Sequence, residues 1–412
     1  MKTIVIIASD VVPLPIKKEY LDSLSVQERK EFKSKYTYAE PAGIRSWKFA
    51  SVLAEKYEVL LLVPDIALPD KLKEIVDFSN IKFEIGSYNY RVSSWNWTQE
   101  LDRKLKKANF VIVQCNSGSG IQNCSVLPST VNLIVDGYNI LPQELSGKLL
   151  THSMISRKVF WQKAMMLYND LITRSNCLLV ANERQTFFYE GFFYGIGKLN
   201  YSTFQFSPLL KVPYGIEKKE FTETNFNISS NNLKLLWYGT VYPWECPEVL
   251  IKELADFDKI SIDFINIKHT RQPKVFNTYF KSFFDNVPNI SNIQIIDDID
   301  FDLGTAHEEY DFGICLNRNW IYESYVHKTR ALEMLANQLP IIINDLDNLN
   351  TELDFLKDNI RNVNIPSIKE NLITICENKK SSKISKDSYE TFTNIFNWNN
   401  TLLPVIDYIE NF

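Results

Sequence analysis

The chain has 412 residues, of which 45% are hydrophobic, 13% aromatic and 23% charged, and its formal net charge is -5. This composition excludes a largely disordered chain, and the length predicts two or three domains. The acidic balance disfavours a globally basic nucleic-acid binder and leaves only local basic clusters open. No apolar stretch reaches the ~18 residues of a membrane-spanning helix.

The start of the chain and its cysteines bear on the cellular compartment. The opening run MKTIVIIASD has a short apolar segment followed by Asp10, where a signal peptide needs small residues, so we expect no cleaved leader. Six scattered cysteines show no zinc-type spacing, and most lie in or beside apolar runs, as reduced buried thiols do. We therefore expect a cytoplasmic protein, with attachment to the inner face of a membrane left open.

In the first half of the chain, short apolar runs alternate with helical patterns. The runs are rich in Val, Ile and Leu and show little polar alternation, which indicates strands buried on both faces. Apolar residues recur every three or four positions at 44–54, and 157–175 is a second helical segment. The alternation predicts a parallel sheet with right-handed crossovers. The predicted strands are Thr3–Ser9, Glu58–Pro64, Asn109–Gln114, Val131–Asp136 and Asn176–Ala181.

The same pattern restarts after the polar stretch 217–232, whose composition is typical of a linker. The chain therefore predicts an α/β fold of two tandem Rossmann-like, doubly wound domains that face a central cleft, the first spanning 1–216 and the second beginning at 233. Ligands of such sheets bind beyond the carboxyl ends of the strands, near the switch point. The predicted strands of the second domain are Leu233–Tyr238, Ser261–Ile267, Ile293–Ile296, Asp311–Leu316 and Pro340–Ile343, and its main helices are Pro247–Phe257 and His327–Asn337.

A glycine stands at the start of the first long helix, in Pro41-Ala42-Gly43, after a long charged loop. Glycine permits a tight turn and lets a ligand approach the backbone closely. A helix start also offers free N–H groups and a positive dipole end to a phosphate. Gly43 is therefore a candidate ligand contact, and the alternative is that it only makes the turn.

Seven segments carry a family resemblance through their order and spacing. They are PAGIRSWKFASVLAEKYEVLLLVPD (41–65), LIVDGYNI (133–140), CLLVANERQ (177–185), VPYGI (212–216), LLWYGTVYPW (235–244), YDFGICLNRNWIYESYVHKTRALEMLANQLPIII (310–343) and FNWNNTLLPVIDYIENF (396–412). In this order they resemble family-4-type retaining glycosyltransferases of the two-Rossmann, or GT-B, fold. The resemblance covers nearly the whole chain, and no single motif decides it.

The resemblance implies transfer of a sugar, with retention, from a nucleotide-sugar donor to a hydroxyl acceptor. It implies no metal and no cofactor, because the nucleotide sugar is a substrate. The acceptor would be a saccharide, a lipid-linked glycan or another hydroxyl compound, in surface polysaccharide or glycoconjugate synthesis. The donor would lie mainly on the second domain, 233–395, and the acceptor on the first, with the last helix, 396–412, crossing back. The alternatives are a silent nucleotide- or sugar-binding partner of an active transferase, and transfer to a nucleic-acid base, protein or small metabolite.

The segment 310–343 holds the richest candidate donor site. Glu333 stands where the family's second acidic residue binds the ribose, and a carboxylate can accept both ribose hydroxyls. The alternative is an exposed helix glutamate. Tyr325 replaces the family's first glutamate, and Glu323 or the Tyr325 hydroxyl would substitute for it.

Four potential donors, Arg318, His327, Lys328 and Arg330, flank the predicted helix start. Cations and a helix dipole reinforce one another on a diphosphate. The alternative is a solvated charged face. Arg330 ranks below His327 and Lys328, because it could point outward and pair with Glu333.

The glycine loop GTVYPWECPE (239–248) contains no cation, whereas many relatives carry Arg and Lys shortly after it. Gly239 and Thr240 can offer backbone N–H groups, and Tyr242 and Trp244 can form a pocket wall. Diphosphate binding would then depend on 318–330, or the chain would have lost transfer activity.

Asp136 closes a predicted strand of the first domain and could orient or deprotonate the acceptor hydroxyl. The alternative is a cap of a helix or turn. Asp298 and Asp300 in DDIDFD are compatible with a metal pair, but Asp is also common in polar turns, so we predict no metal site there.

Overall fold

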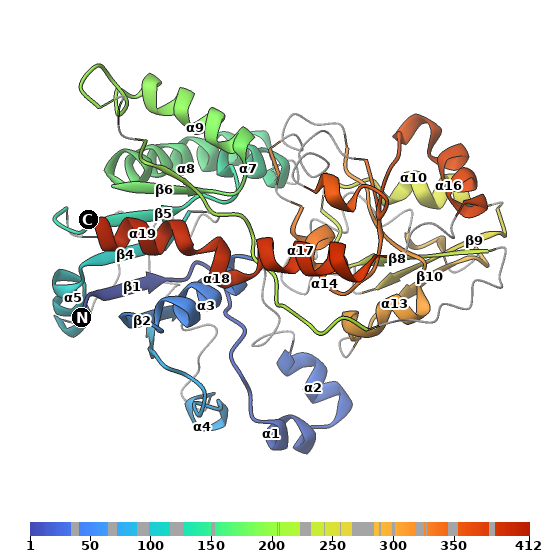
Figure 1. Ribbon diagram of the computed structural model, residues 1–412, viewed down its shortest axis with the longest axis horizontal. Helices are drawn as coiled ribbons and strands as arrows, with labels where there is room; N and C mark the ends of the chain where they lie inside the picture. Colours follow the sequence, from blue (N-terminus) through green and yellow to red (C-terminus); the bar gives the residue numbers. More distant parts are fainter. Residues whose placement is uncertain are drawn as a thin grey trace. The chain divides into compact units, whose positions relative to one another are not determined.

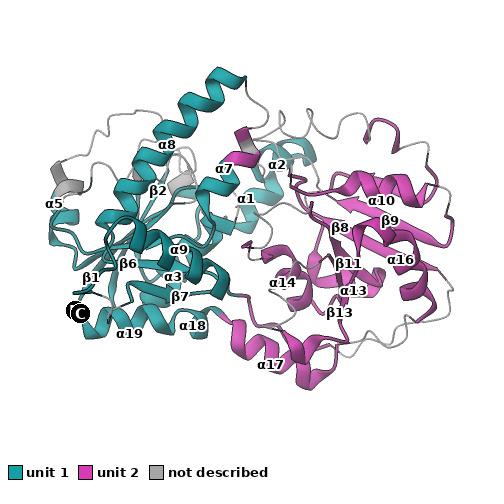
Figure 2. Ribbon diagram, turned by 90° about the horizontal axis from the view of Figure 1, so that it is seen from above, with its two compact units in different colours: residues 1–145, 153–215, 398–412 teal, residues 146–152, 216–397 magenta. Residues whose placement is uncertain are grey.

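The computed structural model describes most of the chain as two compact units. Residues 1–145, 153–215 and 398–412 form unit 1, and residues 146–152 and 216–397 form unit 2 (Figure 2). Sequence analysis placed the corresponding boundaries at 216 and 396. The described residues are all except 34–40, 65–71, 89–98, 116–126, 128, 150–152, 204, 206, 223–231, 243, 256, 266–283, 288–289, 299–300, 319–324, 327, 345–352 and 379–383.

Unit 1 is built on a seven-stranded parallel sheet of described residues, in the order β3-β2-β1-β4-β5-β6-β7 (Figure 1). Val5 of β1 lies opposite Leu60 of β2 on one side and Val111 of β4 on the other. The central strands are buried on both faces, which explains their unbroken apolar runs. The strands are β1 (Thr3–Ile7), β2 (Glu58–Pro64), β3 (Glu84–Tyr88), β4 (Phe110–Gln114), β5 (Leu133–Asp136), β6 (Cys177–Val180) and β7 (Leu209–Lys211).

Helices connect these strands, and the last two return the chain to unit 1. Lys2 donates to the carbonyl of Ile409 at 2.5 Å, and Phe110 packs edge-on against Tyr408 and Phe412, so the two chain ends lie together (Figure 1). The helices assigned to residues of this part are α1 (Lys18–Ser23), α2 (Val26–Phe32), α3 (Pro41–Leu53), α4 (Leu72–Ile75), α5 (Gln99–Lys107), α7 (Leu141–Leu149), α8 (Met154–Arg174), α9 (Glu183–Gly195), α18 (Trp398–Thr401) and α19 (Leu403–Asn411).

Unit 2 contains a six-stranded parallel sheet of described residues, in the order β10-β9-β8-β11-β12-β13. One apolar cluster extends through it from Leu233 on the first strand to Ile375 on a covering helix. The strands are β8 (Leu233–Tyr238), β9 (Ile260–Ile265), β10 (Ile293–Ile296), β11 (Phe312–Cys315), β12 (Ile341–Ile343) and β13 (Ile360–Asn362). The helices are α10 (Pro247–Leu254), α13 (Ala306–Glu309), α14 (Thr329–Ala336), α16 (Ile368–Glu377) and α17 (Lys386–Phe396), with 3-10 turns η4 (Leu303–Thr305), η6 (Asp354–Leu356) and η7 (Ile365–Ser367).

The two sheets confirm the predicted α/β fold of tandem doubly wound domains, and three strands went unpredicted. These are β3, β7 and β13, and each lies at the edge of its sheet. The sequence of β3, EIGSY, mixes polar and apolar residues. The three residues of β13 are only partly buried. An edge strand has one unpaired side, so it lacks the continuous apolar run of a central strand.

One interpretation of the sequence was that Gly43 makes a turn before its helix, but Gly43 lies inside the helix. The described helix α3 already includes Pro41, and Gly43 lies in its first turn. A Cβ atom at this position would stand 1.6 Å from the carbonyl oxygen of Val11. Glycine is needed there because the helix packs directly onto the backbone of the segment after β1.

None of the helices in the described part of the chain is long and apolar enough to cross a membrane.

Candidate functional site

Each sheet reverses its strand order once, and polar side chains gather at both places. The reversal lies between β1 and β4 in unit 1 and between β8 and β11 in unit 2. Beyond the carboxyl ends of the strands at such a point lies the usual ligand site of an open α/β sheet.

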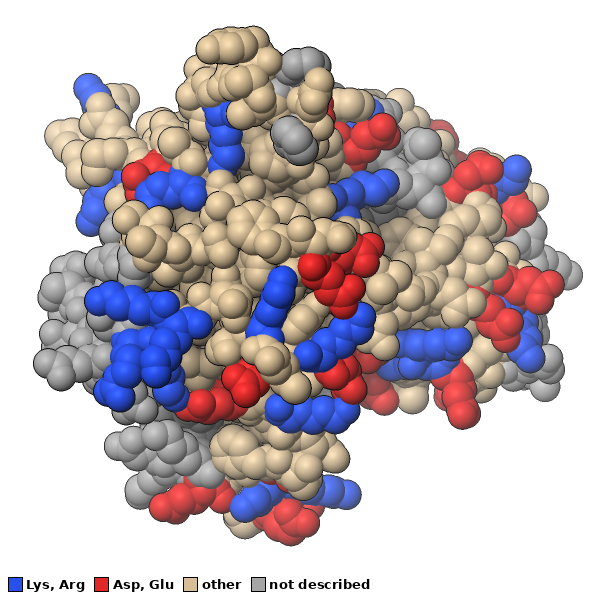
Figure 3. Space-filling view, turned by 60° about the vertical axis from the view of Figure 1, so that its left-hand side comes forward, with Lys and Arg blue, Asp and Glu red and all other residues tan. Residues whose placement is uncertain are grey.

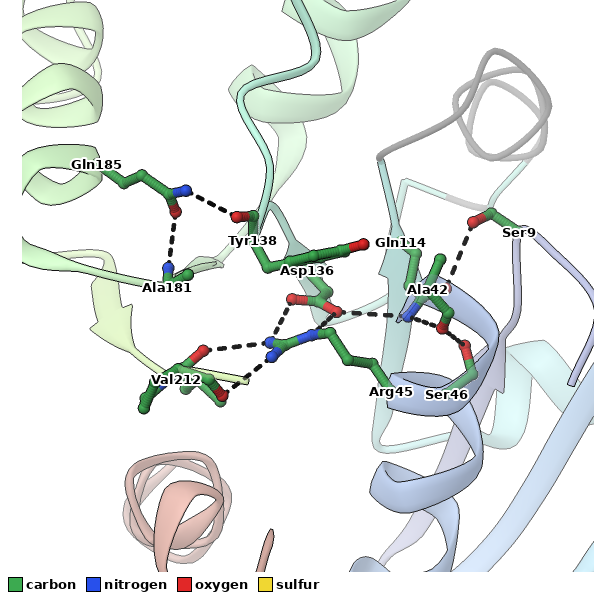
Figure 4. A network of polar contacts seen from close by, with 11 residues as sticks. Ser9, Ala42, Arg45, Ser46, Gln114, Asp136, Tyr138, Ala181, Gln185 and Val212 are labelled. Carbon is green, nitrogen blue, oxygen red and sulfur yellow. Dashed lines mark hydrogen bonds and ion pairs between the residues drawn. The ribbon is translucent and has the colours of Figure 1, made fainter. Parts of the chain in front are cut away.

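In unit 1 the central feature is a buried ion pair between Arg45 of α3 and Asp136 at the end of β5 (Figure 4). Arg45 Nε and Nη2 donate to the two carboxylate oxygens of Asp136 at 2.9 and 2.8 Å. Nη1 and Nη2 also donate to the carbonyls of Pro213 and Val212 at 3.0 and 3.3 Å. Both side chains are 0% exposed, so the pair ties α3, β5 and the segment after β7 together.

Aromatic rings enclose the guanidinium of this pair. Its Cζ atom lies 5.0 Å from the ring centre of Phe49 and 4.9 Å from that of Tyr138. Rings at this distance attract a cation through their negative faces, most strongly where water is excluded. The Arg45 charge is thus compensated by one carboxylate, two carbonyls and two rings.

A second set of bonds holds the carboxylate in place from β4. The Gln114 amide donates to Asp136 at 3.4 Å and to the Ala42 carbonyl at 2.6 Å, and the Ser9 hydroxyl donates to Gln114 at 3.3 Å (Figure 4). The carboxylate therefore has partners from two elements and no exposed surface. Contact between Asp136 and an acceptor hydroxyl would require Arg45 to release it, and sequence analysis did not foresee this pairing.

In unit 2 the glycine loop after β8 receives its cation from α14. Gly239 has φ +91°, and a Cβ atom there would stand 3.4 Å from Arg330 Nε. Arg330 Nη2 donates to the Thr240 carbonyl at 2.7 Å, and Nη1 lies 3.0 Å from Oε1 of Glu245. The sequence left open that Arg330 points outward, but its guanidinium bonds to Thr240 and Glu245 of the loop that has no cation of its own.

Glu245 organises the loop from its other end. Its Oε2 accepts from the Tyr242 amide at 3.0 Å, while Oε1 faces Arg330. Burial raises the pKa of Glu245, and Arg330 and the Tyr242 N–H group oppose that rise. Sequence analysis missed Glu245. A signal was present, because an acidic residue in a loop that is expected to face phosphate requires a cation beside it.

Charged residues of the glycine loop and of the α14 region act electrostatically on the Cys315 thiol at the end of β11. Burial raises the pKa of the Cys315 thiol to about 11, while Arg330 and Lys328 lower it and Glu245 and Glu333 raise it. All four charged groups therefore lie within electrostatic reach of one sulfur atom. Lys328 immediately precedes α14 and is 8% exposed, so it is not part of a solvated charged face.

Three further predicted residues, Arg318, Tyr242 and Trp244, lie on or beside this loop with other partners. The Arg318 guanidinium pairs with Glu248 of α10 at 2.6 Å, and its amide donates to the Trp244 carbonyl. The rings of Tyr242 and Trp244 stack on each other, 4.7 Å apart and 3° from parallel. Tyr325 is half-buried, and Glu323 and His327 lie outside the described residues.

One hydroxyl in the glycine loop is buried without a bond. Thr240 is 6% exposed, and its Oγ1 finds no hydrogen-bond partner among the described residues. A buried hydroxyl normally has a partner, so this one is available to a ligand. The described residues contain no group of three His, Cys, Asp or Glu side chains arranged for a metal ion, and Asp300 lies outside them.

Two doubly wound parallel sheets in tandem define the GT-B architecture. Sucrose-phosphate synthase from Thermosynechococcus elongatus has a similar structure, with a TM-score of 0.63 and 11% identity over 100% of this chain and 99% of that one. Anabaena HepE, solved in complex with UDP and glucose, gives 0.60 and 10% over 100% of both chains, and WaaG, a glycosyltransferase involved in lipopolysaccharide biosynthesis, gives 0.55 and 11% over 98% of both. No protein-family model and no curated protein matches the chain. These likenesses concern the fold.

Proposed function

We propose that the chain is a glycosyltransferase that moves a sugar from a nucleotide-sugar donor to a hydroxyl acceptor, with retention and without a metal ion. The fold supports this, since its solved examples include Anabaena HepE with UDP and glucose. The sequence resemblance supports a saccharide or lipid-linked acceptor and a role in surface polysaccharide or glycoconjugate synthesis. We place the protein in the cytoplasm.

The observation that carries the proposal is the position of Arg330. Its guanidinium lies over Gly239 and Thr240, at the point where the strand order of unit 2 reverses. A phosphate beyond β8 would meet this cation, the Thr240 hydroxyl and the N–H groups of the glycine loop. The loop therefore does not need the Arg and Lys that its own sequence lacks.

The chemistry follows from where charge develops. The bond between the anomeric carbon and the diphosphate oxygen breaks, a bond to the acceptor oxygen forms, and the acceptor hydroxyl passes its proton to the departing diphosphate. Negative charge builds on the leaving diphosphate, and Arg330 and Lys328 would stabilise it most strongly at the transition state. Glu333 would accept the ribose hydroxyls.

The geometry of unit 1 supports a positioning role for Asp136. The carboxylate holds Arg45, and Arg45 holds the Val212 and Pro213 carbonyls that lead out of unit 1. Asp136 would thus shape the acceptor side through Arg45, and a role as acceptor base would require that pair to open. Gly43 contacts the backbone of Val11, so we assign it to packing in place of donor binding.

The test is binding followed by turnover. Purified protein is screened for a rise in unfolding temperature with UDP, GDP, ADP and TDP, because a ligand of the native state stabilises it by mass action. The matching nucleotide sugars are then assayed, in excess EDTA, for release of the nucleoside diphosphate. We expect one nucleotide to bind and Arg330→Met to abolish its effect, while Arg361→Met on β13 leaves it unchanged. A protein that none of the diphosphates stabilises would contradict the proposal.

The second candidate is a silent nucleotide- or sugar-binding partner of an active transferase. The bond between Arg330 and Glu245 favours it, because a carboxylate beside the cation offsets part of the charge available to a diphosphate. The same assay separates the two. A silent partner binds the nucleotide and releases none from any donor, whereas an active enzyme releases it slowly even without acceptor.

A further inference from the structure

The exposed surface of α8 carries a line of apolar side chains, with the polar Gln162 between the second and the third. Ile155, Val159 and Met166 are 81%, 60% and 65% exposed. They are spaced by four and seven residues, so they share one side of the helix. The helix buries side chains only near its end, at Tyr168, Leu171 and Ile172, and residues 154–167 bury none. A polar outer side is the rule for such a helix, so a line of three exposed apolar side chains calls for a partner.

Lysines flank this apolar line. Lys158 and Lys163 are exposed and lie on the two sides of the line that runs from Ile155 to Met166. Residues 154–169 contain no Asp or Glu. The first acid, Asp170, lies 3.5 Å from Arg174 one turn further on. From residue 154 to 169 the outer face of α8 therefore offers apolar surface, positive charge and the exposed amide of Gln162, and no negative charge.

We propose that this outer face of α8 docks onto the surface of an anionic lipid bilayer. Its chemistry matches an interfacial helix, whose apolar side chains enter the boundary between headgroups and acyl chains while lysines reach the lipid phosphates. Anionic lipid complements a face with no acid. A second copy of this chain fits less well, because two such faces would bring lysines together. From residue 155 to 166 the face is about 17 Å long and lies flat on a surface.

Both ends of α8 are fixed, so the face is formed before it meets a membrane. The Ser153 side chain accepts from the Ser156 amide at the start of the helix. At its end, the Lys198 ammonium donates to the carbonyls of Ile172 and Ser175. The Tyr168 hydroxyl donates to that of Tyr189 on α9 at 2.7 Å. Docking then needs no folding step, in contrast to peptides that become helical only at the lipid surface.

The proposal goes beyond the proposed transferase, and it would bring unit 1 to the surface where a lipid-linked acceptor lies. Another basic site in the same unit provides the comparison. Figure 3, which brings forward the side of the molecule with both chain ends, shows Lys and Arg side chains gathered at one place. The last turn of α5 contains Lys104, Lys106 and Lys107 with no exposed large apolar residue among them. The end of α5 therefore offers lysines without exposed large apolar side chains, whereas α8 offers lysines together with them.

The test is co-sedimentation of the purified chain with phosphatidylcholine vesicles, with and without phosphatidylglycerol. We expect binding only with phosphatidylglycerol, at least about tenfold weaker in Ile155→Gln/Val159→Gln/Met166→Gln and in Lys158→Gln/Lys163→Gln. Val26→Gln on α2, where the side chain is also 81% exposed, and Lys106→Gln/Lys107→Gln on α5 should bind as the unchanged protein does.

Three outcomes would overturn the proposal. The unchanged protein fails to bind anionic vesicles, the apolar variant binds as well as the unchanged protein, or the α5 variant loses binding as the α8 variants should. A dimer that dissociates in the apolar variant, without vesicle binding, would assign the face to a second copy. Nucleotide-induced stabilisation is measured on the same variants, so that misfolding, or failure of the transferase proposal, is seen separately from loss of docking.

Discussion

An arginine–carboxylate pair lies near the carboxyl ends of the strands in each sheet, and these two pairs differ in how completely they are enclosed. Arg45 and Asp136 in unit 1 are 0% exposed and make two bonds to each other and two to carbonyls. In unit 2 the Arg330 side chain is 20% exposed and that of Glu245 9%. The first pair is sealed, whereas the second keeps a surface that a ligand can reach.

This difference indicates that the two pairs have different roles. A sealed pair contributes shape, since removing either partner leaves a buried charge without compensation. In unit 2 Arg330 keeps exposed surface through which it can meet an incoming anion, while Glu245 beside it is almost fully enclosed. We therefore expect substitutions in unit 1 to act on stability and those in unit 2 to act on ligand binding and turnover.

The largest expected effect is on unit 1. Arg45→Met should destabilise it by about 3–5 kcal/mol, because Asp136 is left buried and unpaired. A chain of two units need not unfold in one step, so the stability of unit 1 must be measured by itself. Hydrogen exchange of the β4 and β5 amides gives that stability. The double variant Arg45→Met/Asp136→Leu should recover most of the lost stability, because it removes the unpaired carboxylate as well. If the β4 and β5 amides exchange equally fast in Arg45→Met and in the unchanged protein, the pair is not sealed.

The next effect concerns turnover in unit 2. Lys328→Ala should lower the turnover rate by ~10²–10³, because the charge it stabilises develops as the donor bond breaks. Affinity for the nucleoside monophosphate should change far less, since that ligand lacks the leaving group. Exchange of the β8 and β11 amides should stay as it was. Equal losses in rate and monophosphate affinity would make Lys328 a ground-state binder only.

Glu333 should affect the nucleoside instead. Glu333→Ala removes the carboxylate proposed to accept the ribose hydroxyls, so nucleotide affinity should fall by roughly 1.5–3 kcal/mol. Isothermal titration with the ribonucleotide and its 2′-deoxy counterpart checks this, because the deoxy ligand should lose little in the variant. Glu377→Ala at the end of α16 is a matched helix control. Unchanged affinity in a folded Glu333→Ala protein would show that Glu333 is an ordinary surface glutamate.

The sequence predicted the central strands and helix α14, because both depend on local pattern. The apolar run of β8 and the segment 327–337 specify their elements without distant partners. The side-chain directions of Arg45 and Arg330 depend on residues far along the chain, Asp136 and Glu245, and local spacing could not supply them. One signal was present, since Arg45 shares the buried side of α3 with Ala42 and Phe49 and a buried arginine requires a buried anion.

The smallest effect is a pH dependence of the stability of unit 2 that arises from Glu245. Burial raises the pKa of Glu245 from its ordinary value of 4.5, so native unit 2 holds this proton to a higher pH than the unfolded chain does. Between the two pKa values the native state binds more protons, so stability must fall as pH rises through that window and must stop falling above the native pKa. Glu245→Gln has no proton to lose there, so its stability should lack this decline. Hydrogen exchange of the β8 amides, measured from pH 4.5 upward in both proteins, tests the sign. A stability that rises with pH only in the unchanged protein would mean that Arg330 outweighs burial and that the second pair is as firmly closed as the first.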